Sequence, residues 1–218
     1  MIGRRLFTLG AAGLALGACE DRMPSSAVYA LVDVSGSYFR ELGTAVRTLR
    51  VMMAGLKAHD SFAVAEIGAC SFSDDAVLLR FTAPDRPTER TRLIAANAQR
   101  LNDYANKARA TNFTDIRGAL TQAAQYLASR EAEHRSIVVF SDFEEDLAPT
   151  CRRDTPLPRE LRGMTVIATN VTRLPDDNRD PAHYARRLES WRKLVEAAGA
   201  SWQLMPDPAD VVATLRGS

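Results

Sequence analysis

The chain has 218 residues, of which 46% are apolar and 25% are charged, and its formal net charge at pH 7 is +1. These values are typical of a soluble globular protein, and the length suits one α/β domain with an N-terminal extension. The balanced charge gives no sign of a basic surface, so we expect no nucleic-acid partner.

The first 19 residues have the pattern of an export signal. Arg4 and Arg5 precede an apolar run, residues 6–16, which is too short to span a bilayer. The segment ends in LGAC, which resembles the bacterial lipobox, where the cysteine, here Cys19, becomes acylated and forms the new N-terminus. The paired arginines also resemble a twin-arginine signal. Ordinary secretion and an uncleaved N-terminal helix are the alternatives.

Lipid on Cys19 would divide the chain into three parts. Residues 1–19 would be the lipoprotein signal peptide, residues 20–26 a short tether and residues 27–216 the folded domain. We then expect an exported protein anchored to the cell membrane or the outer membrane, on the periplasmic side.

A short apolar run, residues 28–32, predicts a strand that is buried on both faces. Asp33, Ser35 and Ser37 follow it, where the strand gives way to a segment with helical periodicity. In open α/β sheets, ligands bind at the carboxyl ends of the strands. Oxygen ligands there suit a hard cation such as Mg²⁺ or Mn²⁺. The alternative is a turn in which Asp33 or Ser35 caps the helix.

The next segments predict a helix, a hairpin and a second helix. Residues 38–58 repeat apolar side chains every three or four positions, as an amphipathic helix on a sheet does. Residues 61–68 and 76–81 predict strands. Their short connection implies an antiparallel pair, because a parallel crossover needs about a dozen residues. Residues 89–108 predict the second helix.

Two more segments carry candidate site residues. Residues 111–115 open a helix with a continuous apolar face, and Thr114 and Asp115 both suit its cap. Residues 136–140 predict a fourth buried strand, which ends at Ser141 and Asp142. Three acidic residues come next: Glu144, Glu145 and Asp146. We interpret Glu145 and Asp146 as part of a solvated loop.

The rest of the chain begins with an irregular loop at 147–161, a strand at 164–171 and a polar linker at 176–181. A helix at about 184–198 is stopped by Gly199. A short strand at 201–205 and a closing helix at 210–215, capped by Asp207, follow. The whole pattern predicts an α/β fold of three layers, Rossmann-like, with a mostly parallel six-stranded sheet and one antiparallel edge strand.

Three short motifs lie at the ends of these elements, in order along the chain. They are Asp33-x-Ser35-x-Ser37 after the first strand, Thr114 ahead of a helix, and Asp142 after the fourth strand. Together they resemble the metal-ion-dependent adhesion site, or MIDAS, of the von Willebrand factor A domain family. The resemblance covers nearly the whole predicted domain.

The chain departs from the family pattern at two positions. Phe113 stands where the family usually has glycine before the threonine, which leaves Thr111 as an alternative to Thr114. Phe143 replaces the glycine that usually follows the aspartate.

The resemblance implies a role for each candidate. Ser35, Ser37 and Thr114 would coordinate Mg²⁺, or Mn²⁺ or Ca²⁺, through hydroxyl oxygens, and Asp33 and Asp142 would hold its waters or bind it directly. A glutamate or aspartate of a partner protein would complete the coordination. The family's function is binding, so we expect no enzymatic activity.

Three cysteines are an odd number for an exported protein. If Cys19 carries lipid, Cys70 and Cys151 remain, and both should lie at the edge of the sheet that carries Ser35. A disulfide between them suits an oxidising compartment. Two separate thiols are an equal alternative, because sequence does not give cysteine geometry.

Other functions are less consistent with these residues. In a phosphohydrolase with Asp33 as nucleophile, a second aspartate two residues on would act as acid and base, but Ser35 stands there. Ser35 also lacks the Gly-x-Ser-x-Gly motif of serine hydrolases. A scaffold with a vestigial metal site, binding partners through residues 147–161 and the acidic rim, stays open.

Overall fold

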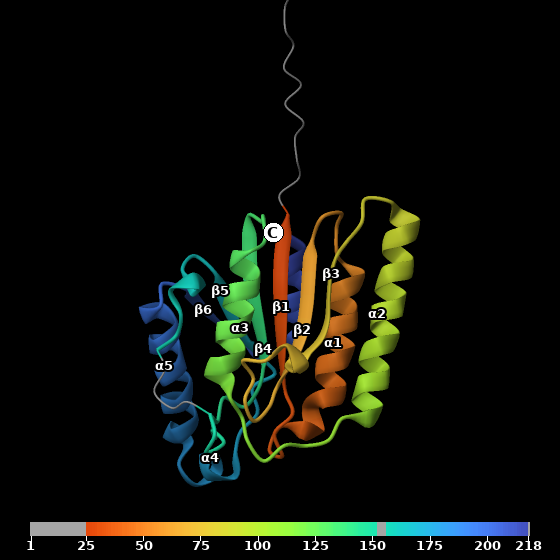
Figure 1. The fold of residues 1–218 in the computed structure, drawn as a ribbon. Helices are drawn as coiled ribbons and strands as arrows, with labels where there is room; N and C mark the ends of the chain where they lie inside the picture. Colours follow the sequence, from red (N-terminus) through yellow and green to blue (C-terminus); the bar gives the residue numbers. More distant parts are fainter. Residues whose placement is uncertain (1–24, 152–155, 218) are drawn as a thin grey trace, which may run out of the picture.

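A six-stranded sheet lies between two layers of helices in the computed structural model, which describes residues 25–151 and 156–217 (Figure 1). The expected signal peptide, Cys19 and most of the tether lie outside the described residues. Among the described residues, no helix is both long and apolar enough to cross a bilayer.

The strands lie in the order β3-β2-β1-β4-β5-β6. Every neighbouring pair is parallel except β2 and β3, which are antiparallel at the edge. The predicted fold class is therefore confirmed. The bounds are β1 (Ser26–Asp33), β2 (Ser61–Ile67), β3 (Val77–Thr82), β4 (His134–Phe140), β5 (Thr165–Thr169) and β6 (Ser201–Met205).

Three helices cover each face of the sheet. α1, α2 and α6 lie on one side; α3 and α5 lie on the other, with α4 beside α5 (Figure 1). The bounds are α1 (Leu42–Ala54), α2 (Pro87–Lys107), α3 (Ile116–Ala128), α4 (Pro175–Arg179), α5 (Pro181–Ala197) and α6 (Pro208–Gly217).

The central strand β1 is apolar throughout because both of its faces are covered. Tyr29 and Leu31 pack into the core against α3, and Ala30 and Val32 pack into the core against α1. Successive side chains of a strand point to opposite faces, so one short run fills both cores. β1 thereby fixes the position of the residues that follow it, Asp33 first among them.

Two predicted segments differ from the structure. The first helix begins at Leu42, after a 3-10 turn at Phe39–Glu41, because the Ser35 carbonyl accepts hydrogen bonds from the next residues. The expected linker 176–181 contains α4. Pro175 occupies the first helical position, where its missing N–H costs nothing, and Asp177 accepts a hydrogen bond of 2.7 Å from the Leu174 N–H.

Candidate metal centre

Four of the five predicted site residues are linked by hydrogen bonds at the carboxyl ends of β1 and β4. Asp33 Oδ1 accepts a bond of 2.7 Å from the Ser35 N–H. The Ser35 and Ser37 hydroxyl oxygens are 3.2 Å apart, and Ser37 Oγ donates to Asp142 Oδ2 at 2.6 Å. The first and third motifs, more than a hundred residues apart, therefore form one cluster of oxygen atoms.

Ser141 joins Asp33 to the same cluster from β4. Its hydroxyl donates to Asp33 Oδ2 at 2.6 Å and accepts from the Phe143 N–H at 2.9 Å. β1 and β4 are neighbours in the sheet, so Ser141, directly after β4, reaches Asp33 at the end of β1. Sequence reasoning noted Ser141 only as part of the motif and gave it no contact.

The two carboxylates of the cluster lack a positive partner in the part of the chain that the structure describes. Asp33 and Asp142 are both fully buried, and no ion pair joins either to a basic side chain within the described ranges. Burial raises the pKa of Asp33 to about 6. Buried carboxylates are stable when a cation neutralises them, so the donor set fits a divalent ion.

Thr114 and Thr111 make different contacts. Thr111 Oγ1 donates to the Phe113 carbonyl at 2.8 Å, and its backbone pairs with that of Val34 and Gly36. Thr114 is 3% exposed, and its backbone pairs with that of Asp146. Its hydroxyl has no hydrogen-bond partner among the described residues. These contacts favour Thr114 as the free oxygen.

Asp115 is the N-cap of α3, and its hydrogen bonds hold the backbone next to Thr114 in place. Its Oδ1 accepts from the Gly118 N–H at 2.8 Å, and its Oδ2 accepts from the Ser71 N–H at 2.9 Å. A Cβ atom at Gly118 would lie 2.1 Å from Asp115 Oδ2. A side chain at 118 would therefore displace the Asp115 carboxylate from this cap.

Phe143 stands where the related motif has glycine, and its backbone has the geometry that glycine favours. Its φ is +62°, in the left-handed region that costs a side chain about 1–2 kcal/mol. The ring is buried and packs edge-on against Trp191 and Trp202, at centroid distances of 5.9 and 5.3 Å. Burial of the aromatic ring offsets the backbone strain.

Helix α5 holds the same loop through two side chains that sequence reasoning missed. Arg187 Nε donates to the Asp142 carbonyl and Trp191 Nε1 to the Phe143 carbonyl, each at 2.9 Å. Arg187 also forms a bidentate pair with Asp177, at 3.0 and 2.8 Å. The predicted helix, about 184–198, includes both residues, but nothing in the sequence marks their contacts with this loop.

Of the two acidic residues interpreted as solvated, Asp146 is exposed as expected and Glu145 is not. The interpretation of Glu145 as a solvated residue is wrong: its side chain is 14% exposed and pairs with Arg117 Nε at 2.9 Å. Asp146 pairs through its backbone with Thr114. Glu144 is half exposed and lies 3.8 Å from Arg187.

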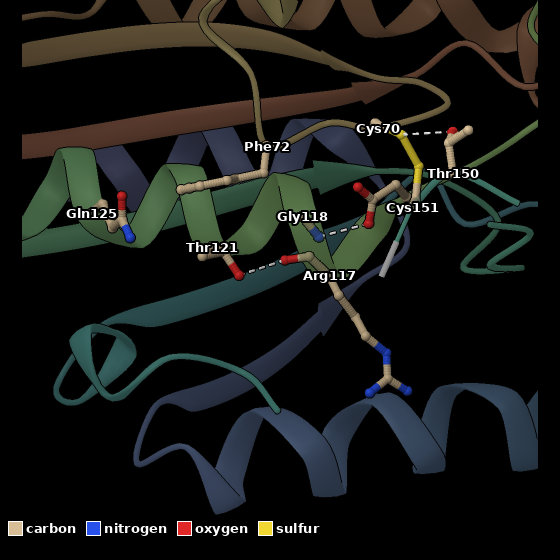
Figure 2. Close-up of a pocket in the computed structure, with 9 residues that line it drawn as sticks. Cys70, Phe72, Arg117, Gly118, Thr121, Gln125, Thr150 and Cys151 are labelled. Atoms are coloured by element: carbon tan, nitrogen blue, oxygen red, sulfur yellow. Dashed lines mark hydrogen bonds between the residues drawn. A yellow bond between two sulfur atoms is a disulfide. The ribbon is translucent and has the colours of Figure 1, made fainter. Parts of the chain in front are cut away.

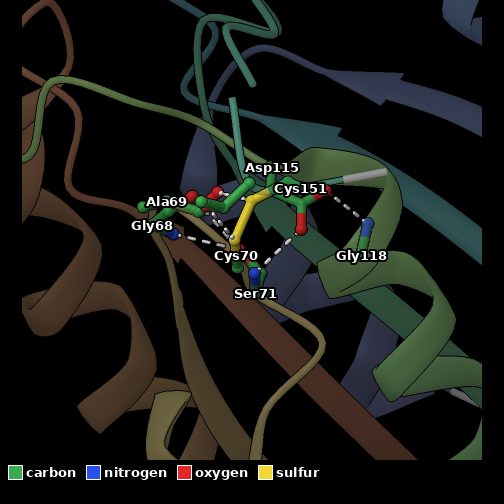
Figure 3. Close-up of a disulfide and its surroundings, with 8 residues drawn as sticks. Gly68, Ala69, Cys70, Ser71, Asp115, Gly118 and Cys151 are labelled. Atoms are coloured by element: carbon green, nitrogen blue, oxygen red, sulfur yellow. Dashed lines mark hydrogen bonds between the residues drawn. A yellow bond between two sulfur atoms is a disulfide. The ribbon is translucent and has the colours of Figure 1, made fainter. Parts of the chain in front are cut away.

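The structure contains a disulfide between Cys70 and Cys151, whose Cα atoms are 5.8 Å apart (Figure 3). Beside it lies a pocket of about 410 Å³, along the N-terminal part of α3 (Figure 2). Phe72 is exposed at this pocket, and Arg117 and Thr121 line it from the helix. Both features adjoin Asp115 and lie on the flank of the candidate site.

No group of three or more His, Cys, Asp or Glu side chains in residues 25–151 and 156–217 is placed to hold a metal ion. A cation site in this part of the chain therefore depends on hydroxyl oxygens. Ser35 and Ser37 supply them beside the two carboxylates, and Thr114 is the expected third hydroxyl. This composition suits Mg²⁺, Mn²⁺ or Ca²⁺ and does not suit zinc.

No protein-family model and no curated protein matches the sequence. Solved structures do match. A von Willebrand factor type A protein from Catenulispora acidiphila is 15% identical with a TM-score of 0.54, covering 89% of this chain and 42% of that one. The PilB minor pilin from Streptococcus sanguinis is 10% identical with a TM-score of 0.55, covering 90% of this chain and 62% of that one.

An aerotolerance-related membrane protein from Bacteroides fragilis is 12% identical with a TM-score of 0.52, covering 88% of this chain and 97% of that one. This chain thus spans less than half of the Catenulispora protein and nearly all of the Bacteroides one. Identities this low carry information on the fold alone. The sheet order, the antiparallel edge pair and these matches together show that the chain has the α/β fold of a von Willebrand factor type A domain.

Proposed function

We propose that this protein binds a divalent cation at the carboxyl edge of its sheet and, through that cation, a carboxylate of a partner protein. The observation that carries the proposal is the burial of Asp33 and Asp142 beside two serine hydroxyls, with no basic partner in residues 25–151 and 156–217. A bound Mg²⁺ would supply the missing positive charge and an open coordination position.

Each residue has a defined part in this proposal. Ser35, Ser37 and Thr114 would hold the cation through neutral hydroxyl oxygens. Asp33 and Asp142 would hold its waters or bind it directly, and both are oriented for this by bonds to neighbouring backbone N–H groups. Because three of the ligands are neutral, the cation keeps enough charge to attract an Asp or Glu side chain of the partner.

The position of the protein in the cell follows from other features. The signal-like first 19 residues and the lipobox around Cys19 support export and anchoring to a membrane on the periplasmic side. The disulfide supports an oxidising compartment. We therefore propose a membrane-anchored binding protein and no enzymatic role. Ser35 has no histidine partner among the described residues, which supports this choice.

Thermal unfolding with EDTA and with Mg²⁺ tests the cation site. At a concentration a hundred times the dissociation constant, Mg²⁺ should raise the free energy of unfolding by about 2.7 kcal/mol. The variant Ser37→Ala removes an exposed hydroxyl of the cluster and should lose this response. Ser129→Ala removes an exposed hydroxyl at the far end of α3 and should keep it.

The outcomes separate the two open functions. If the wild-type protein shows no shift with Mg²⁺, Mn²⁺ or Ca²⁺, the metal site is vestigial and the scaffold alternative is correct. If the shift occurs, a partner captured in Mg²⁺ should be released by EDTA. A partner that stays bound in EDTA contradicts binding through the cation.

A further inference from the structure

The Cys70–Cys151 disulfide closes a ring of contacts around Thr114, the candidate ligand that comes from neither β1 nor β4. Two chain segments flank it, residues 68–71 after β2 and residues 145–151 after β4. We propose that the disulfide positions Thr114, so that the affinity for the cation is coupled to the oxidation state of this disulfide. The inference rests on the cation site proposed above.

The first segment is bonded to the residue directly after Thr114. The Gly68 carbonyl accepts from the Asp115 N–H at 2.8 Å, and Ser71 donates its N–H to Asp115 Oδ2 at 2.9 Å. Ser71 Oγ also accepts from the Gly68 N–H at 3.0 Å, which holds the segment in a tight turn. Figure 3 shows Cys70 within this turn, facing Cys151 across the disulfide.

The second segment is bonded to Thr114 itself and to the helix behind it. Thr114 and Asp146 exchange two backbone hydrogen bonds, of 2.7 and 3.1 Å. Glu145 accepts from both the backbone N–H and the side chain of Arg117, each at 2.9 Å. Cys151 follows a few residues later on the same segment.

Thr114 therefore lies between two segments that the disulfide joins directly, although the cysteines are 81 residues apart in sequence. Each segment follows a different strand, and β1 separates those strands in the sheet. When the disulfide is reduced, the segments lose their direct covalent link and are held near each other by noncovalent contacts. A ligand contributes fully to affinity only when its supporting residues hold it in place.

The disulfide is open to a reductant, because Cys70 is exposed and both cysteines line the pocket beside α3 (Figure 2). A dithiol reduces it in two steps. One thiolate attacks a cysteine sulfur and displaces the other cysteine as a thiolate, and the second thiol of the reagent then displaces the first cysteine. The products are two protein thiols and the cyclic disulfide of the reagent, which has lost two electrons.

The coupling must act in both directions. If reduction weakens cation binding by some factor, bound cation makes reduction less favourable by the same factor. A disulfide that served only the general stability of the domain would leave both factors at one in the folded protein. Mg²⁺ is the suitable probe, because it binds oxygen ligands and has little affinity for thiols.

The test begins with calorimetric titration of Mg²⁺ into the purified oxidised protein and into the variant Cys70→Ser/Cys151→Ser. Affinity should fall about tenfold in the variant, the size expected when a group that orients a ligand is lost. Equal affinities would overturn the inference. Leu101→Ala, in the core against α1, destabilises the domain elsewhere and should keep the wild-type affinity. An equal loss of Mg²⁺ affinity in Leu101→Ala would also overturn the inference.

A second measurement needs no variant. The wild-type protein is equilibrated with reduced and oxidised dithiothreitol, in EDTA and in saturating Mg²⁺, and the reduced fraction is counted after thiol trapping. Mg²⁺ should shift the equilibrium toward the disulfide by the factor found in the titrations; no shift overturns the inference. If the oxidised protein binds no Mg²⁺ at all, the proposed cation site fails and this inference fails with it.

Discussion

The two sides of the candidate metal centre are held in place by different physical means. On the Thr114 side, two segments that flank the threonine are joined by a covalent bond. On the Asp142 side, Arg187 and Trp191 of α5 donate to backbone carbonyls of the loop, and nothing covalent is involved. One site thus combines a support that depends on redox conditions with one that depends on charge and aromatic packing.

This difference shows how the backbone of a loop can be held in one conformation although the loop is not part of a strand. The Asp142 loop leaves β4 in a left-handed conformation at Phe143, and its carbonyls would otherwise need solvent. A buried arginine with a fixed carboxylate partner and an indole N–H satisfy them from the neighbouring helix. The Thr114 segment instead relies on backbone pairing and a cross-link.

The largest effect should come from removing the covalent support. For cysteines 81 residues apart, the loss of loop entropy predicts that Cys70→Ser/Cys151→Ser lowers the free energy of unfolding by about 4.5 kcal/mol. Urea unfolding of the oxidised protein, the reduced protein and the variant measures this. The last two should agree, and a loss below about 1 kcal/mol would mean that the cross-link stabilises little.

The next effect should come from Arg187→Met, which removes the charge from the other support. Asp177, whose side chain is fully buried, then loses its guanidinium partner and keeps the contact of 2.8 Å with His183 Nδ1; breaking such a buried pair costs about 4 kcal/mol. Arg186→Met is the control on the same helix, because its pair with Asp180 is exposed and exposed ion pairs contribute little to stability. Equal losses in the two variants in urea would contradict a structural role for Arg187.

The same pair predicts a pH dependence. Hydrogen bonds from the Arg187 guanidinium hold the pKa of Asp177 well below its ordinary value of 3.8. Above that value both the folded and the unfolded chain carry the charge, and the full stabilisation is present. As the pH falls below about 4, the unfolded chain takes up the proton first and the stabilisation is lost.

Urea unfolding of the wild type and Asp177→Asn between pH 5 and pH 3 measures this dependence. The gap between the two free energies should stay constant down to about pH 4 and narrow below it. The disulfide variant should show no such narrowing against the wild type. A gap that is constant to pH 3 would mean that Arg187 does not lower this pKa.

The smallest effect concerns the backbone at Phe143. Phe143→Ala and Phe143→Gly both lose the ring, but glycine relieves the positive φ and should be the more stable of the two by about 1 kcal/mol. Phe140, in β4, gives the matched control. There the order should reverse, because glycine weakens a strand by about 0.5–1 kcal/mol relative to alanine. Thermal unfolding of the four variants measures the order of stability at each position. The same order at both positions would contradict the strain at Phe143.

Much of the fold follows from local patterns in the sequence. The apolar run 28–32 and its counterpart 136–140 predict buried strands because they lack the alternation of a half-exposed sheet. Asp33, Ser35 and Ser37 were predicted from the end of the first strand, and Asp142 was predicted from the resemblance to the third MIDAS motif. The structure links Asp33, Ser35, Ser37 and Asp142 directly.

The parts that sequence reasoning missed depend on distant or backbone partners. Arg187 and Trp191 bind carbonyl oxygens, which every residue possesses and no pattern marks. Glu145 looked solvated because its partner Arg117 lies 28 positions away in another element. Phe143 takes the place of glycine only because two tryptophans from later elements bury its ring.

The direction of β1 determines which way the candidate centre faces. The described chain enters the sheet at the amino end of this strand, and Asp33 lies at the opposite end (Figure 1). Eight strand residues span about 26 Å at roughly 3.3 Å each. With the proposed tether at residues 20–26, the domain would stand between the bilayer and its own binding edge. The cation would then face away from the lipid, where a partner approaching from the aqueous side meets it first.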